Sequence, residues 1–249
     1  MTRLIIALFL VLLCGKVAAE QELTLIANTS PPYADNQLPD QGLAMELVKH
    51  VFSRTDYTPE ITIESWSRAV EGARLGVYQA LASVWYSPDR DKDLLFSQPY
   101  LRSELIILKR RTDTTHYREL ADLAGKRLGV RTDYAYGVDF RSVPGLQLVE
   151  ENHLVQLLLR LLNGSVDAVI GDRRTVTMQL NEFLQDRLNE FAVTPIQLPD
   201  VERHVAASRS WEGHEAMIGA FNKALIEVEK DGSHAAIIKQ WDERYGEIQ

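Results

Sequence analysis

The sequence has few of the residues that build covalent or metal sites. Its single cysteine, Cys14, lies close to the amino terminus, so the rest of the chain offers no disulfide and no cysteine nucleophile. There is no phosphate-binding loop, no Gly-x-Gly-x-x-Gly loop and no Gly-x-Ser-x-Gly elbow. The six histidines have no partners at short range, and they are His50, His116, His153, His204, His214 and His234. No motif of a nucleotide-dependent or hydrolytic enzyme is present.

The aspartates of the segment 89–93 begin like a calcium loop and then depart from it. Leu94 stands where that loop requires glycine, and Tyr100 stands where it requires a bidentate glutamate. We therefore expect no metal site and no cofactor.

Net positive charge is also lacking. The chain of 249 residues carries a formal charge of −8. Its basic clusters, Lys109-Arg110-Arg111 and Arg173-Arg174, are too short to offset that charge locally. An acidic surface argues against nucleic acid and against an anionic membrane surface as partners. The length allows one large domain or two small ones.

The first 19 residues have the composition of a cleaved signal peptide. Arg3 precedes an apolar run of ten residues, Leu4 to Leu13, and Val17-Ala18-Ala19 provides a small-residue cleavage site. Ten residues are too few to cross a bilayer as a helix. A lipoprotein is the alternative, because Cys14 follows the run, but Leu13 is too large for the residue before a lipidated cysteine. We expect export to the periplasm and a mature chain that starts near Glu20.

Strand and helix patterns alternate along the first part of the mature chain. Predicted strands are 23–27, 60–64 and 80–85, and predicted helices are 42–52 and 67–75. Such alternation predicts an α/β fold with a mostly parallel sheet and helices on both faces.

A second set of the same kind follows a strand at 104–109, which we interpret as the first crossing between two lobes. Its predicted elements are strands 127–130, 166–170 and 191–198, and helices 134–140, 152–162 and 175–184. A return strand, 203–208, and two terminal helices, 214–229 and 233–245, complete the chain. The prediction is a discontinuous first lobe (22–108 plus 203–249) and a second lobe (109–202), with two crossings that form a hinge.

Arg90 follows the buried strand 80–85 and the break at Ser87-Pro88. Ligands of α/β sheets bind beyond the carboxyl ends of the strands, where Arg90 stands. Its planar guanidinium suits a carboxylate. The alternative is a solvated charge run in which Arg90 pairs with the neighbouring aspartates.

Five segments in order resemble the periplasmic solute-binding proteins of the amino-acid-binding type, the bacterial extracellular solute-binding family 3. They are Pro32-Tyr33 with Gly42-Leu43, then Trp66-Ser67-Arg68-Ala69, then Ser87-Pro88-Asp89-Arg90 with Phe96-Ser97-Gln98-Pro99-Tyr100, then Leu123-Ala124-Gly125-Lys126, and finally Gly164-Ser165-Val166-Asp167-Ala168 with Asp172. The resemblance implies the two-lobed periplasmic-binding-protein fold of type II and a binding protein without enzymatic activity. It also implies a small-molecule ligand, such as an amino acid or a related zwitterion, and a membrane permease or receptor as partner. We expect a monomer.

The same resemblance assigns two charged residues to the ligand. Arg90 would bind its carboxylate, and Asp172, at the end of a second-lobe strand, would bind its ammonium group. Asp172 also suits the N-cap of the helix that starts at Arg173, and one residue can serve both ends.

Aromatic and small residues of the first lobe complete the expected cleft. By resemblance, Tyr33 and Trp66 line it, although core packing is the commoner position of an aromatic side chain. Pro31-Pro32 holds Tyr33 on a stiff loop, which favours a surface-facing position in the cleft. Ser83 and Trp85 lie at the strand end before Arg90, and Trp85 departs from the Ser or Thr of many family members. That departure either narrows the pocket or leaves Trp85 in the core.

The second-lobe loop from Arg131 to Gly137 also departs from the family. Thr132-Asp133-Tyr134 replaces the usual Gly-Thr pattern, so Arg131 and Tyr134 become candidate contacts. A helix beginning at Tyr134 would point its N–H groups at a ligand carboxylate. Two alternatives stay open: a ligand sensor that docks on a receptor, and a cleft enzyme similar to cyclohexadienyl dehydratases. In the enzyme, Asp172, Asp133 or His153 would act as acid or base.

Overall fold

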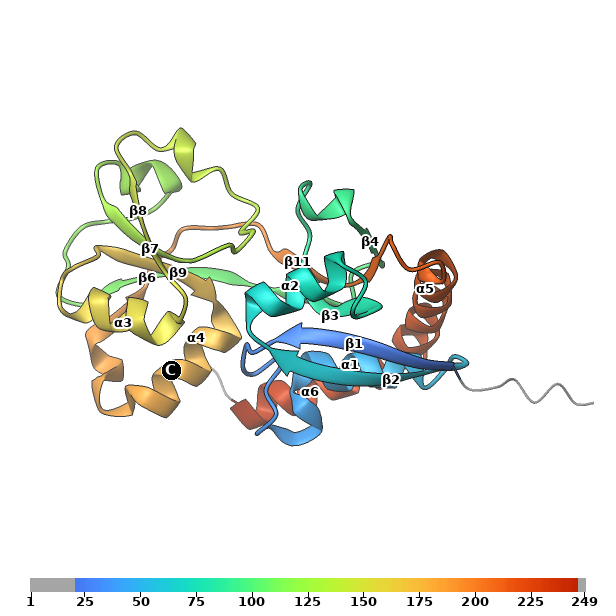
Figure 1. Cartoon of the computed structure of the whole chain (residues 1–249). Helices are drawn as coiled ribbons and strands as arrows, with labels where there is room; N and C mark the ends of the chain where they lie inside the picture. Colours follow the sequence, from blue (N-terminus) through green and yellow to red (C-terminus); the bar gives the residue numbers. More distant parts are fainter. Residues whose placement is uncertain (1–20, 246–249) are drawn as a thin grey trace, which may run out of the picture.

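Two lobes make up the protein, each built around its own β-sheet (Figure 1). The structure is a computed structural model that describes residues 21–245, so the predicted signal peptide lies outside the described residues. Within 21–245 no helix combines the length and the apolar character that a bilayer crossing requires. The α/β fold and its two-lobed form are as predicted from the sequence, but both sheets are mixed where mostly parallel sheets were expected, since at least half of the strand pairings in each are antiparallel.

The first lobe contains a sheet with the strand order β2-β1-β3-β11-β4. Its parallel part comprises β1 (Gln21–Asn28), β2 (Tyr57–Glu64) and β3 (Ala80–Trp85). Its antiparallel part comprises β11 (Val201–Ser208), β5 (Leu101–Ser103) and β4 (Leu94–Phe96). β5 and β4 pair with successive halves of β11. The sequence pattern predicted the parallel part, but strands as short as β4 and β5 carry too little periodicity to be recognised.

Helices cover both faces of this sheet. They are α1 (Leu43–Phe52), α2 (Trp66–Arg74), α5 (His214–Lys230) and α6 (Ser233–Tyr245). Alternate residues of β1 serve the two faces: Leu25 packs with α1, α5 and α6, whereas Ile26 packs with α2. Because successive side chains of a strand point to opposite faces, β1 contributes apolar side chains to the helical layers on both sides of the sheet.

The second lobe contains a sheet with the order β10-β6-β9-β7-β8. Its strands are β6 (Leu105–Arg110), β7 (Arg127–Arg131), β8 (Gln147–Glu151), β9 (Ala168–Asp172) and β10 (Phe191–Val193). Two α-helices, α3 (Leu154–Leu162) and α4 (Arg173–Phe183), pack on one face. Short 3-10 turns occur throughout the chain: η1 (Pro39–Gln41), η2 (Arg90–Lys92), η3 (Leu120–Leu123), η4 (Phe140–Ser142) and η5 (Gln185–Glu190).

The chain passes between the lobes beside Glu104 and again between β10 and β11. Glu104 is anchored to the second lobe, because its carbonyl accepts from Arg173 N at 2.8 Å and its carboxylate pairs with the Arg173 guanidinium at 2.6 Å. The predicted boundary at residue 108 is wrong by a few residues. The apolar strand β6 pairs with β9 and β10, so residues 105–110 belong to the second sheet.

Candidate functional site

Arg90 is held at the carboxyl end of β3 by its own loop. Ser87 terminates the extended chain, and its hydroxyl accepts from Arg90 N at 3.3 Å. The Arg90 side chain turns inward and is 9% exposed. Burial lowers the pKa of Arg90, yet a guanidinium remains charged at any physiological pH.

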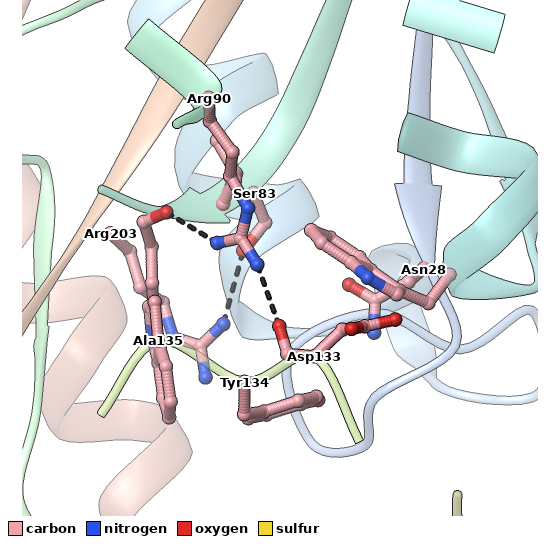
Figure 2. A pocket seen from close by; sticks show the side chains of 10 residues that line it. Asn28, Ser83, Arg90, Asp133, Tyr134, Ala135 and Arg203 are labelled. Atoms are coloured by element: carbon pink, nitrogen blue, oxygen red, sulfur yellow. Dashed lines mark hydrogen bonds between the residues drawn. The ribbon is translucent and has the colours of Figure 1, made fainter. Parts of the chain in front are cut away.

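The Arg90 guanidinium bridges the two lobes. Nη1 donates to the carbonyl of Trp85 at 2.7 Å, and Nη2 donates to the carbonyl of Asp133 in the second lobe, also at 2.7 Å (Figure 2). Its Cζ lies 4.5 Å from the centre of the Trp66 ring. Arg90 is therefore a buried cation whose fixed partners within the described chain are neutral carbonyls.

The aspartates of the charge run pair with other cations. Asp89 pairs with Arg74 and Lys92, and Asp93 also pairs with Arg74. Asp91 pairs with Arg209. The interpretation of Arg90 as one member of a surface charge run is wrong, because the chain buries its guanidinium between the lobes while the aspartates stay outside.

Tyr33 is positioned by the loop between β1 and α1. This loop supplies acceptors to the start of α1: Pro32 O accepts from Leu43 N at 2.9 Å, and Tyr33 O accepts from Ala44 N at 3.0 Å. Gly42 joins the loop to the helix at φ +107°, a conformation that side chains rarely adopt. The expectation that Tyr33 faces the surface is wrong, since its ring is 0% exposed and packs in the core of the first lobe, but its hydroxyl reaches across the cleft to the second lobe.

Asp172 ends β9 and receives hydrogen bonds from both lobes. Its Oδ1 accepts from Thr175 N at 3.0 Å, which confirms the predicted N-cap of α4. The Tyr33 hydroxyl donates to both carboxylate oxygens at 2.8 Å. Burial, reinforced by the Asp172 carboxylate, raises the pKa of Tyr33, so the phenol keeps the proton that it donates.

Arg203, on β11, was missed as a site residue. It is 5% exposed, and it donates from Nε to Ser103 Oγ at 2.9 Å and from Nη1 to Ser83 Oγ at 3.2 Å. Its Nη2 lies 3.9 Å from Asp172 Oδ2, and its Cζ lies 3.5 Å from the centre of the Tyr33 ring. The sequence gives little signal for it, because Arg203 stands between the polar residues Glu202 and His204, and only the pairing of β11 with β3 places it beside Ser83.

The predicted helix from Tyr134 to Phe140 is wrong. Residues 132–139 form an irregular loop in which Asp133 adopts φ +58° and Gly137 adopts φ +69°. Tyr134 and Tyr136 instead pack edge-on against Trp85 of the first lobe, with ring centres 5.0 and 5.8 Å away. Tertiary contacts between aromatic rings override a weak helical pattern here. The loop offers Arg90 a carbonyl acceptor and no helix N-terminus.

Arg131 lies at the outer side of the same loop. Its guanidinium contacts the Tyr134 ring, 4.3 Å from the ring centre, and donates to the Tyr134 hydroxyl. Nη2 also donates to Asn152 O at 3.0 Å. Arg131 therefore orients Tyr134 from outside the closed part of the cleft.

A cavity of about 20 Å³ remains between the lobes beneath these contacts. Five predicted site residues line it, namely Trp66, Ser83, Trp85, Arg90 and Tyr134, together with Arg203 and Asn28. The guanidinium groups of Arg90 and Arg203 both point into it (Figure 2). This volume holds about one water molecule, so an organic ligand enters only when the lobes separate.

A wider groove of about 640 Å³ adjoins the cavity at the mouth of the cleft. Arg131 lines it, as do Asp133 and His153, two candidates for an acid or base. Asp172, the third candidate, bonds Tyr33 at the closed end of the cleft and does not line this groove. The structure therefore separates the acid–base candidates instead of bringing all three together.

A second contact joins the lobes outside the cleft. Arg174 of α4 pairs with Asp242 of α6, at 2.7 Å from Nε to Oδ1. Arg174 also donates to the carbonyl of Arg102 at 3.3 Å. The terminal helix α6 thus contacts the second lobe directly.

The model of the bacterial extracellular solute-binding proteins, family 3, matches residues 24–244. This chain belongs to that family. A probable amino-acid ABC transporter-binding protein of Haemophilus influenzae is 23% identical over 235 residues, which cover 91% of this chain and 88% of that protein. The family consists of binding proteins that act outside the cytoplasm.

A sensor protein has a comparable sequence identity to this chain. The virulence sensor protein BvgS of Bordetella pertussis is 24% identical over 202 residues, which cover 80% of this chain but 16% of the sensor. This chain thus matches a small part of the sensor and nearly the whole of the transport protein.

The fold is found among solved structures. The amino acid ABC transporter substrate-binding protein AbpA of Streptococcus pneumoniae, bound to L-arginine, superposes with a TM-score of 0.74 at 18% identity. The match covers 93% of this chain and 98% of that one. The two-lobed fold of the family is therefore shown for this chain by its overall geometry.

Proposed function

We propose that this protein is exported to the periplasm, where it captures a free amino acid between its lobes and delivers it to an ABC-type permease. The observation that carries the proposal is the pair of buried, oppositely charged residues on facing lobes. Arg90, 9% exposed, lies on the first lobe, and Asp172, 5% exposed, lies on the second. An amino acid brings one carboxylate and one ammonium group, which are the complements of these two side chains.

Arg90 binds the ligand carboxylate in this proposal. In the closed structure its two terminal nitrogens donate to carbonyls of Trp85 and Asp133. A carboxylate is a stronger acceptor for a guanidinium than a neutral carbonyl, so the ligand replaces the Asp133 contact when the lobes close around it. Trp66, stacked on Arg90, keeps the guanidinium plane fixed and dry.

Asp172 receives the ammonium group. The backbone N–H of Thr175 holds the carboxylate in place, and the Tyr33 hydroxyl occupies its outward side. Opening of the hinge separates Tyr33 from Asp172, because they belong to different lobes. The ligand ammonium then takes the position of the phenol, and Trp85 and Tyr134 form the apolar wall around the bound molecule.

A thermal-shift screen tests the proposal. The protein, purified after export, is incubated with the common amino acids, polyamines, organic acids and small peptides. A ligand at about 100 times its dissociation constant adds about 2.7 kcal/mol to the unfolding free energy. Stabilisation by at least one amino acid, and not by the polyamines, supports the proposal. The absence of stabilisation by every amino acid tested contradicts the proposal.

The second candidate is a sensor that docks on a membrane receptor when its lobes close. The similarity to BvgS favours it, as does the ion pair between Arg174 and Asp242, which couples lobe closure to the terminal helix α6. Isolation of the protein from membranes treated with a short cross-linker separates the two candidates. Co-isolation with a permease supports transport, and co-isolation with a signalling receptor supports sensing.

A further inference from the structure

We infer that Arg203 is a second anion-binding residue of the cleft, and that the ligand is an acidic amino acid whose two carboxylates bind Arg90 and Arg203. The inference rests on the proposed function and specifies which class of amino acid binds. Arg203 emerges from the return strand β11, which places its guanidinium on the same small cavity as that of Arg90.

The buried charges of the cleft are unequal in number. Within residues 21–245, three side chains that are charged at neutral pH lie in the buried class: Arg90, Arg203 and Asp172. Two are cationic and one is anionic. With a neutral amino acid the site would keep a net positive charge, because Asp172 would then face both the ligand ammonium group and Arg203, and an uncompensated charge is costly in a water-poor site. Two carboxylates and one ammonium group balance the site, and this is the charge pattern of an acidic amino acid.

The uncharged lining of the cavity is also rich in donors. Trp85 is 5% exposed, and its indole N–H has no hydrogen-bond partner within the described chain. A buried donor without an acceptor is costly, and a ligand oxygen would satisfy it. The unpartnered indole N–H of Trp85 is a second observation, and it also indicates that the ligand presents hydrogen-bond acceptors to this end of the cleft.

The Arg203 guanidinium is preorganised for this task. Ser103 and Ser83 fix its Nε and Nη1, and the Tyr33 ring lies flat beneath it at 3.5 Å. Its Nη2 faces the Asp172 carboxylate at 3.9 Å, which is longer than a hydrogen bond. When a ligand ammonium takes Asp172, the second ligand carboxylate can take Nη2.

The groove at the mouth of the cleft has the opposite charge. Asp35, Asp133 and Glu182 line it, with Arg131 as the counter-charge, and Asp133 lines the edge of the small cavity as well. The Asp133 and Glu182 side chains are exposed, so water and salt screen them more than the buried arginines. These acids disfavour a carboxylate at the mouth, which directs both ligand carboxylates inward.

Isothermal titration calorimetry with L-glutamate and L-glutamine tests the inference, since the two molecules have nearly the same shape and differ by one charge. We expect glutamate to bind at least about 30-fold more tightly than glutamine, because glutamine lacks the second carboxylate that would pair with a buried guanidinium. L-aspartate replaces L-glutamate, against L-asparagine, if the cleft favours the shorter side chain. L-Arginine and glutarate, which lacks the ammonium group, complete the set.

Matched variants locate the effect. In Arg203→Gln the preference for glutamate over glutamine should fall below about threefold, whereas Arg203→Lys, which keeps the charge, should retain a preference. Arg102→Gln is the control, because Arg102 is an exposed arginine of the neighbouring strand β5 that pairs with Glu202. Its preference should equal that of the unmodified protein. The glutamate-to-glutamine ratio of the unmodified protein decides the question even if Arg203→Gln does not fold.

Each outcome has a defined meaning. Equal or tighter binding of the neutral members of both pairs, or of arginine, overturns the inference and leaves the proposed amino-acid function standing. Glutarate binding within tenfold of glutamate also overturns it, because Asp172 would then hold no ammonium. An absence of binding by every amino acid contradicts the proposed function itself.

Discussion

The Tyr33 hydroxyl donates across the cleft to both oxygens of Asp172 at 2.8 Å. Tyr33 belongs to the loop before α1 in the first lobe, and Asp172 ends β9 in the second. This hydrogen bond therefore forms only when the lobes are closed, and it joins two side chains that the sequence separates by 139 positions.

Replacement of Tyr33 by Phe should favour the open form. The substitution keeps the ring in the core and removes the donor, and a hydrogen bond to a charged group contributes about 1.5–3 kcal/mol. Small-angle scattering should therefore give a larger radius of gyration for Tyr33→Phe than for the unmodified protein without ligand. Tyr57→Phe, in which the tyrosine lies on β2 away from the cleft, is the control. An unchanged radius would show that this bond does not hold the lobes together.

Replacement of Gly42 by Ala should destabilise the first lobe. Gly42 has φ +107°, and an added Cβ would lie 2.6 Å from Tyr33 O. Strain of this kind costs about 1–3 kcal/mol, and urea unfolding measures it. Gly219→Ala is the control: in helix α5 a Cβ meets nothing within 4 Å, so this change should stabilise by up to about 1 kcal/mol. Equal effects of the two substitutions would contradict this reading of the Tyr33 loop.

His204 should make stability depend on pH. Burial lowers the pKa of His204, while a hydrogen bond to Ser97 O and the charge of Glu202 partly oppose that shift. Below the unfolded-state value of about 6.5, the unfolded chain takes up a proton that the folded His204 resists. The unfolding free energy should therefore fall as the pH decreases from about 6.5 toward the folded-state pKa.

Urea unfolding of the unmodified protein and of His204→Gln at pH 7.5 and pH 5.5 measures the contribution of His204. The loss between the two pH values should be smaller in His204→Gln, because the other titrating groups are common to both proteins. A loss of the same size in both would exclude His204 as its source.

Much of the fold, and the strand-end positions of several candidate site residues, could be predicted because they depend on local pattern. The all-buried strand β3, followed by Ser87-Pro88, places Arg90 at a strand end, and the strand β9 places Asp172 at another. The rule that ligands bind beyond strand ends in α/β sheets then predicts that both face one cleft. The structure places Arg90 and Asp172 on facing lobes beside Arg203.

The features that the sequence did not reveal depend on contacts between distant segments. Arg203 faces the cavity because β11 pairs with β3 and β5, so that its side chain meets Ser83 and Ser103. The loop at Tyr134 is irregular because its aromatic side chains pack against Trp85 of the other lobe. Tyr33 is buried for the same kind of reason, since its ring packs in the core of the first lobe with Arg203 of β11 over it. Neither the periodicity nor the composition of the sequence indicates which distant segments come into contact.

Titration calorimetry of an Arg90→Gln variant measures whether Arg90 holds the ligand carboxylate. The ligand is the amino acid that stabilises the protein most, and Arg74→Gln is the control, since Arg74 pairs with Asp89 and Asp93 outside the cleft. If Arg90 holds the ligand carboxylate, its loss should weaken binding by about 2–5 kcal/mol while Arg74→Gln binds normally. Unchanged affinity in a folded Arg90→Gln variant would contradict the account.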